Sequence, residues 1–198
     1  PKGRMVFLFT AHCDEDGSII LEAHPSIIDS ALANLKKYGV FFKTEITDIS
    51  DSYSNNQTHL SDLERLRAGK AEVVAETLEM FIPQMLNLDA LGYINFKKGC
   101  YTGQEIIARA HYRGAVKRRM HHLALTTESL PSPGDEIKDN QGKSIGNIAS
   151  AVRAEDTKVE ILAVLNDKYS DSNEMQIGDQ ALTAVTHLPL PYEIPTSP

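Results

Sequence analysis

The sequence has little that would tie it to a membrane, to secretion or to a resident metal. Its apolar runs fall short of the roughly 20 residues that span a bilayer, and no signal-like segment opens the chain. Only two cysteines occur, Cys13 and Cys100, and they form no C-x-x-C pair. Two thiols cannot supply the four ligands of a typical zinc or iron–sulfur site. Unpaired cysteines fit a reducing compartment, so we expect a cytoplasmic protein (mitochondrial matrix if eukaryotic) with no membrane partner and no metal ligands.

Aromatic residues are also scarce, at 7 %, and the net charge of −7 is unevenly spread. The segment 97–122 carries seven Lys or Arg against one acid, Glu105, on an otherwise acidic chain. This asymmetry predicts a local anion site. The later basic residues of this segment could meet ligand carboxylates or phosphates, or could simply form a solvated strand face. These residues are Arg113, Lys117, Arg118 and Arg119. The overall acidity argues against stable nucleic-acid binding, which needs many phosphate contacts.

The 198 residues, 41 % of them hydrophobic, are enough for a substantial core. We expect an α+β module over 1–116 and a small antiparallel β-barrel over 117–198. Near residue 115 the sequence pattern changes to short predicted strands separated by turn residues. The first module is predicted to hold a hairpin (4–12 and 18–23), a helix (25–38), a strand (40–49) and a partly helical stretch (63–91). The strands of the second are predicted at 117–126, 135–138, 144–153, 158–166 and 181–187. The chain opens at Pro1 and not at Met, so we expect the beginning of the first module to be missing.

The most particular string is Lys97-Lys98-Gly99-Cys100-Tyr101-Thr102-Gly103-Gln104-Glu105. Thr102 and Glu105 have the spacing of a capping box, which predicts a helix whose N-cap is Thr102. Cys100 then lies just before a helix start and beside lysines, a setting that favours the thiolate form. A small packed cysteine is the plain alternative.

Neighbouring residues have both functional and structural interpretations. Lys98 could favour the Cys100 thiolate or be a solvated lysine. Tyr101 could stack on a heterocycle or simply pack. Gln104 offers both a donor and an acceptor to an amide-like ring edge. Glu105 and Arg109 are candidate ligand contacts, yet they could equally form a helix cap and an i,i+4 ion pair.

With these residues in view, the chain resembles the YgfZ-type folate-binding proteins, which are relatives of the glycine-cleavage T-protein (aminomethyltransferase). The likeness rests on Lys98 to Glu105 and on further pieces in matching order. These pieces are Pro1-Lys2-Gly3-Arg4, Leu66-Arg67-Ala68-Gly69, Pro83 to Asp89, Ala108-Arg109-Ala110 with Arg113-Gly114 and Lys117-Arg118, Gly134-Asp135, and Ile145-Gly146.

The resemblance implies a protein that binds tetrahydrofolate or a one-carbon-substituted folate. It implies a role in assembly or repair of iron–sulfur client enzymes, including a tRNA-thiolating enzyme, and no enzyme activity of its own on tRNA. Cys100 with Lys98 would be the reactive group, as nucleophile, redox thiol or transient cluster ligand. Tyr101, Gln104, Glu105 and Arg109 would contact the folate, and the Cys100 sulfur is expected beside a cavity shaped for a reduced pteridine.

Two other functions stay open at this stage. One is a one-carbon transferase, whose chemistry wants a carboxylate at the reacting nitrogen. Asp29 is the nominee, although Ser26-x-x-Asp29 is also a helix-start pattern. The other is an RNA-binding module built on 97–122, which the acidic remainder and the few aromatic residues make the weakest.

Overall fold

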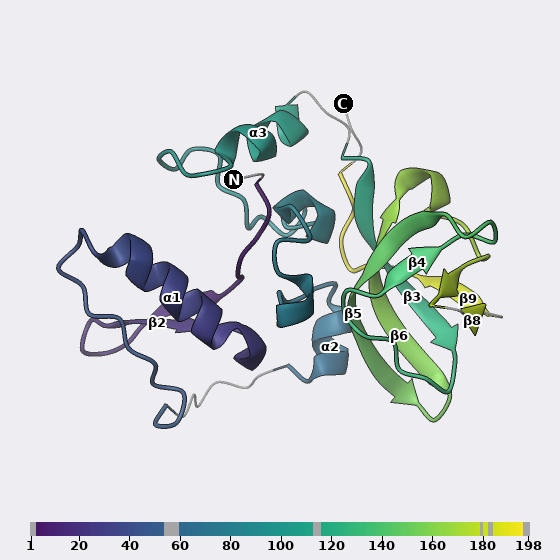
Figure 1. Cartoon of the computed structure of the whole chain (residues 1–198), viewed down its shortest axis with the longest axis horizontal. Helices are drawn as coiled ribbons and strands as arrows, with labels where there is room; N and C mark the ends of the chain where they lie inside the picture. Colours follow the sequence, from purple (N-terminus) through teal and green to yellow (C-terminus); the bar gives the residue numbers. More distant parts are fainter. Residues whose placement is uncertain (1–2, 54–59, 113–115, 179, 182–183, 196–198) are drawn as a thin grey trace.

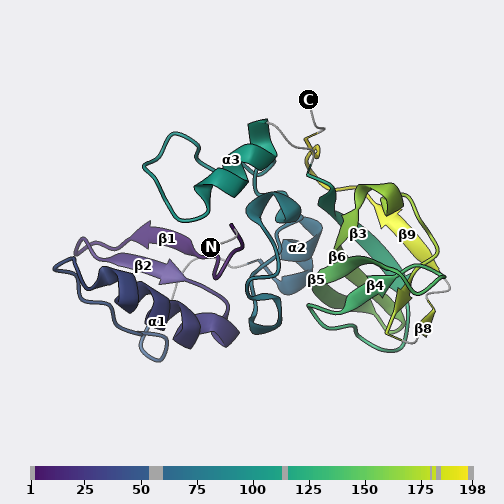
Figure 2. The same ribbon diagram turned by 45° about the horizontal axis from the view of Figure 1, so that its top comes forward.

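Two units of unequal size stand at opposite ends of the molecule, and short helical turns connect them (Figure 1). The computed structural model describes residues 3–53, 60–112, 116–178, 180–181 and 184–195. A hairpin with one helix forms the smaller unit and a seven-stranded sheet forms the larger. The helix α3 (Gln104–Tyr112) lies apart from the hairpin unit in both views (Figures 1 and 2). No helix within the described ranges is long and apolar enough to cross a membrane.

In the smaller unit, β1 (Thr10–Cys13) pairs antiparallel with β2 (Ile19–Glu22). A 3₁₀ turn at Pro25–Ile27 leads into α1 (Ile28–Gly39). The predicted hairpin and helix are therefore confirmed, although the first strand is shorter than 4–12.

The strand predicted at 40–49 is wrong, because these residues lie in turns and irregular backbone. Val40 and Phe41 are 72 % and 88 % exposed. Their β propensity finds no partner strand in the described chain, and an unpaired segment gains nothing from it.

The larger unit is an antiparallel sheet in the order β8-β7-β4-β5-β6-β3-β9. Its long strands are β3 (Arg118–Thr126), β5 (Ser144–Glu155) and β6 (Lys158–Asn166). The short ones are β4 (Glu136–Lys138), β7 (Gln176–Ile177), β8 (Gln180–Ala181) and β9 (Val185–Leu188), and a 3₁₀ turn occupies Asp167–Tyr169. Four of the five predicted strands match this sheet. The fifth, predicted as one strand over 181–187, overlaps two separate short strands, β8 and β9, and part of it lies outside the described residues. The predicted closed barrel is wrong for the described residues, since β8 and β9 end the order as unpaired edges.

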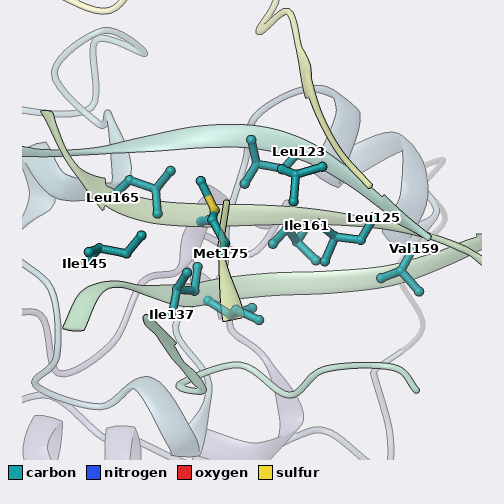
Figure 3. Packing of buried hydrophobic residues seen from close by; sticks show 11 residues of the cluster. Leu123, Leu125, Ile137, Ile145, Val159, Ile161, Leu165 and Met175 are labelled. Atoms are coloured by element: carbon teal, nitrogen blue, oxygen red, sulfur yellow. The ribbon is translucent and has the colours of Figure 1, made fainter. Parts of the chain in front are cut away.

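Strand β6 carries the core because both of its faces are covered. Val159, Ile161 and Leu165 point into a cluster on one face with Leu123 and Met175 (Figure 3). The alternate residues of β6, Leu162 and Val164, belong to a second cluster on the other face. Alternation along a strand sends successive side chains to opposite faces, so a nearly continuous apolar run is what a doubly covered strand requires.

The second cluster is completed by the middle segment. Helix α2 (Asp62–Arg67) begins at a capping box formed by Ser61 and Glu64, and 3₁₀ turns follow at Ala75–Thr77 and Pro83–Leu86. Apolar residues of this segment pack on β3, β5 and β6, namely Leu66, Ala71, Phe81, Leu86 and Leu88. The middle segment and the sheet thus share one core.

A charge network centred on the buried Glu160 carboxylate holds α2 against the sheet. Arg67 donates to both carboxylate oxygens of Glu160 through Nε (3.1 and 3.0 Å) and Nη2 (2.5 Å to Oε1). His122 Nε2 lies 2.9 Å from Oε2 of the same carboxylate. The Arg67 hydrogen bond, opposed by burial and helped by His122, lowers the pKa of Glu160 below 4.5.

Glu160→Gln should lower the free energy of unfolding at pH 7 by about 1.5–3 kcal/mol, the usual range for hydrogen bonds to a charged group. Because the folded pKa is depressed, this stabilisation is complete above the unfolded value near 4.5 and is lost as pH falls through the folded value. Urea unfolding across pH 3 to 7 should show a shallower acid loss for the variant. Glu155→Gln, in an exposed pair with Lys158, is the control and should change little. Equal effects of the two variants would contradict the assignment.

Candidate functional site

The helix that follows the cysteine string begins later than the sequence pattern predicts. Gly103 has φ +89°, outside the helical region, and α3 starts at Gln104. Gly103 is therefore the flanking residue, and Glu105 is the second helical residue instead of the third. The capping box predicted for Thr102 and Glu105 is wrong, because the helix starts one residue too late for it.

The conformation of Gly103 is explained by the N-terminal segment that lies against it. A Cβ on Gly103 would come within 2.7 Å of the Gly3 Cα and 2.9 Å of its nitrogen. A Cβ on Gly3, which is itself at φ +68°, would lie 3.1 Å from Ile106 Cβ. Only glycine permits both the positive φ and this backbone-to-backbone approach. Two segments a hundred residues apart in sequence thus meet at the start of α3.

A third segment reaches α3 through a buried glutamine. Gln84, in the 3₁₀ turn Pro83–Leu86, is fully buried and donates from Nε2 to the Ile107 carbonyl at 2.7 Å. Its Oε1 is buried and has no hydrogen-bond partner among the residues that the structure describes. Ile107 is the buried residue of α3. The turn at 83–86 therefore sets where the helix sits.

The same turn is fixed to the sheet by buried polar contacts. Arg119 donates to both oxygens of Asp89 (2.7 and 2.9 Å) and to the Gln84 carbonyl (2.8 Å). The Asn87 side chain bonds both backbone groups of Met120, at 2.8 and 3.4 Å. The Arg119 and Asp89 side chains are each 9 % exposed. Arg119 is thus committed to a buried structural pair, and neither alternative considered for it, a ligand contact or a solvated strand face, describes it.

The cysteine loop itself lies on the surface. Cys100 is exposed, as is Cys13 at the end of β1. Lys98 places Nζ 4.6 Å from the centroid of the Tyr101 ring, an attractive cation–π contact. Lys98 and Cys100 are both exposed, and Tyr101 is half-buried.

The remaining candidates are on α3 or elsewhere. Gln104 is half-buried in the first turn, whereas Glu105 and Arg109 are exposed.

Of the basic residues that follow α3, Lys117 is exposed and Arg118 is half-buried, and Arg113 falls outside the described residues. Asp29 is exposed in the first turn of α1, away from α3 (Figure 2). The structure thus gathers Cys100, Lys98, Tyr101, Gln104, Glu105 and Arg109 on one loop and helix and leaves Asp29 apart.

Two cavities in the described part of the chain lie away from this loop. One, of about 350 Å³, is lined by sheet and turn residues from Thr127 to Gly178. The other, of about 150 Å³, lies between α2, β5 and His24. Neither is lined by Cys100 or its neighbours, so the cavity expected beside the sulfur does not correspond to either of them.

Comparisons with known proteins give sequence relatives. No protein-family model matches the chain. Two curated proteins, both named "tRNA-modifying protein YgfZ", are 39 % and 38 % identical over 132 residues, from Pectobacterium atrosepticum and Yersinia pestis. A third of the same name, from Sodalis glossinidius, is 28 % identical over 270 residues that include 95 % of this chain and 82 % of that protein. The chain is thus similar in sequence to curated YgfZ proteins.

These alignments differ in how much of each protein they cover. The first two alignments cover 65 % of this chain and 40 % of each relative. The Sodalis alignment runs over 270 positions, which is more than the 198 residues of this chain. The alignment therefore includes stretches of the Sodalis protein that have no counterpart in this chain. A glycine cleavage aminomethyltransferase T from Bartonella henselae has a TM-score of 0.48 and 18 % identity, over 66 % of this chain and 37 % of its own.

Several residues that build the candidate site were not singled out from the sequence. Gly3 and Gly103 appear in the family strings, yet their mutual contact leaves no local signal. Gln84 and Asn87 lie in the Pro83–Asp89 string, and Asn87 adopts φ +55°. Asparagine tolerates that region better than most residues, which is the one signal that could have drawn attention to it.

Proposed function

We propose that this chain is a reduced-folate-binding protein that supports iron–sulfur enzymes acting in tRNA modification, with Cys100 as its reactive group. One observation carries the proposal: three family strings, around Gly3, Gln84 and Gly103, converge on the start of α3. Backbone that approaches this closely is costly to build, and here it places the cysteine loop beside the helix. The printed names of the relatives supply the connection to tRNA modification.

The side chains at this place have the chemistry that a reduced folate requires. Gln104 offers an amide donor and acceptor for a pterin edge, and Arg109 a guanidinium for glutamyl carboxylates. Tyr101 offers a ring face, one side of which Lys98 covers at 4.6 Å. Glu105 adds an acceptor for the pterin amino groups. When bound, a reduced folate supplies a carrier for a one-carbon unit.

Within this proposal, Cys100 is exposed, so a protein partner can reach its sulfur without unfolding the loop. Lys98, whose Nζ lies over the Tyr101 ring, would add positive charge to the same loop, and this division of roles separates the thiol from the folate contacts on α3. We also propose that 1–116 and 117–198 act as two modules, the first holding the folate and the second supporting it through the shared core.

Replacing Cys100 with alanine should at least halve the activity of cluster-dependent enzymes in a strain that relies on this protein. Cys13→Ala is the matched control, because Cys13 is the other exposed thiol, and it should leave those activities unchanged. Both variants should accumulate to the wild-type level, since neither residue is buried. The readout is enzyme activity per amount of client protein. Unchanged activity with Cys100→Ala, or an equal loss with Cys13→Ala, would remove the cysteine from the proposal.

A further inference from the structure

Aromatic side chains close the cysteine loop onto the far end of α3. The Phe96 ring stacks on His111, with centroids 4.1 Å apart and planes 23° apart. Tyr112 meets both rings edge-on, at 5.7 Å from Phe96 and 4.6 Å from His111. This stack thus holds the loop against the C-terminal end of α3, whereas the Gly3–Gly103 contact holds the N-terminal segment against the start of the helix.

The same loop and helix also carry exposed, positively charged side chains. The Asn95 side chain accepts hydrogen bonds from the backbone nitrogens of Lys97 and Lys98, at 2.8 and 3.2 Å. This local turn holds the segment from which both lysine side chains extend, exposed, into solvent. Arg109 is also exposed and lies three residues before Tyr112, so the two share a face of α3.

The exposure of the aromatic rings decides what such a surface can bind. Tyr112 is 66 % exposed and Tyr93, at the start of the loop, is 57 % exposed. Between residues 93 and 112 the one acidic residue is Glu105. Exposed ring faces among cations are the combination that binds single-stranded nucleic acid, by stacking bases and neutralising phosphates. The low aromatic content of the whole chain concealed this local concentration.

We propose that the surface formed by residues 93–101 and the outer face of α3 binds single-stranded RNA. In the absence of folate, Lys97, Lys98 and Arg109 would contact phosphates, and Tyr112 would stack on a base beside the Phe96–His111 pair. The inference deepens the tRNA-modification part of the proposed function and rests on it for the choice of RNA. It reverses the expectation, drawn from composition, that no stable nucleic-acid binding occurs.

The test is fluorescence anisotropy of a labelled oligouridine of about ten nucleotides, titrated with the chain at several salt concentrations. Three phosphate contacts predict a slope of log K against log salt of about −2, and K97A/K98A should make it shallower by about 1.4. Tyr112→Ala should weaken binding by roughly five- to a hundredfold, and Tyr112→Phe should restore it.

The helix α1 provides matched controls. Lys36 and Lys37 are an exposed lysine pair, and Lys37 lies 5.4 Å from the ring of Tyr38, which is 60 % exposed. K36A/K37A and Tyr38→Ala should leave RNA binding unchanged. The inference is overturned by absent binding at low salt, by equal losses in the α1 variants, or by equal affinity for oligouridine, duplex DNA and polyglutamate. If the chain binds tetrahydrofolate but does not bind RNA, this inference alone is refuted. If it binds RNA but does not bind tetrahydrofolate, the folate proposal alone is refuted.

Discussion

Replacing Asp89 by alanine is expected to lower the free energy of unfolding by about 3–5 kcal/mol, the cost of leaving a buried charge without its partner. Asp89 takes two hydrogen bonds from Arg119, and both side chains are 9 % exposed. Removing the carboxylate leaves the guanidinium in a place that water reaches poorly. Urea unfolding at pH 7 measures the change.

The control for this variant is Glu155→Ala, which breaks an ion pair that is 65 % and 61 % exposed and should cost about 1 kcal/mol or less. In the double variant D89A/R119M both charges are gone, so part of the loss should be recovered. A cost below 1 kcal/mol for Asp89→Ala, or a double variant less stable than the sum of the single ones, would contradict a buried and mutually dependent pair.

Gly103→Ala should separate the N-terminal segment from α3. The added Cβ would meet the Gly3 backbone at 2.7 Å, and the φ of +89° strains any residue with a Cβ. Positive-φ strain costs of order 1–3 kcal/mol, and the clash adds to it, so we expect a loss of about 2–4 kcal/mol. The Met5 amide, which bonds the Phe81 carbonyl at 2.9 Å, should lose protection from hydrogen exchange.

Two other glycines separate the causes of this effect. Gly92 has φ +73° but open space around its Cβ position, so Gly92→Ala reports strain alone. Gly99 has open space and no positive φ, so Gly99→Ala should be nearly neutral. The Met5 amide should stay protected in both. Exchange at Met5 that is as fast in Gly92→Ala as in Gly103→Ala would show that the Gly3 contact is not what positions the segment.

The strands and helices were predictable wherever the pattern that forms them is local. The prediction of a strand at 158–166 matches β6, because a run that is apolar on both faces has few other solutions. The strand predicted at 40–49 failed for the opposite reason. Val40 and Phe41 have suitable side chains, but a strand also needs a partner, and propensity within a segment does not reveal one.

The candidate site was predictable as a string and not as an arrangement. The cysteine string does lie in a loop that precedes a helix, but the φ of Gly103 depends on Gly3, a hundred residues earlier. Arg119 looks like part of a solvated basic run until its partner Asp89, thirty residues away, is known. Charge and spacing along the chain can mark candidate residues. The Gly3–Gly103 and Asp89–Arg119 contacts, however, arise from tertiary packing between segments that are far apart in the sequence, so no short window of the sequence predicts them.

The account as a whole depends on reduced folate binding at the start of α3, and one titration tests that directly. Tetrahydrofolate is added to the isotopically labelled chain while backbone amide resonances are followed by NMR. We predict saturable shifts centred on Gly3, on residues 93–103 and on the first turns of α3. An absence of saturable shifts, or shifts confined to the cavity that runs from Thr127 to Gly178, would contradict it.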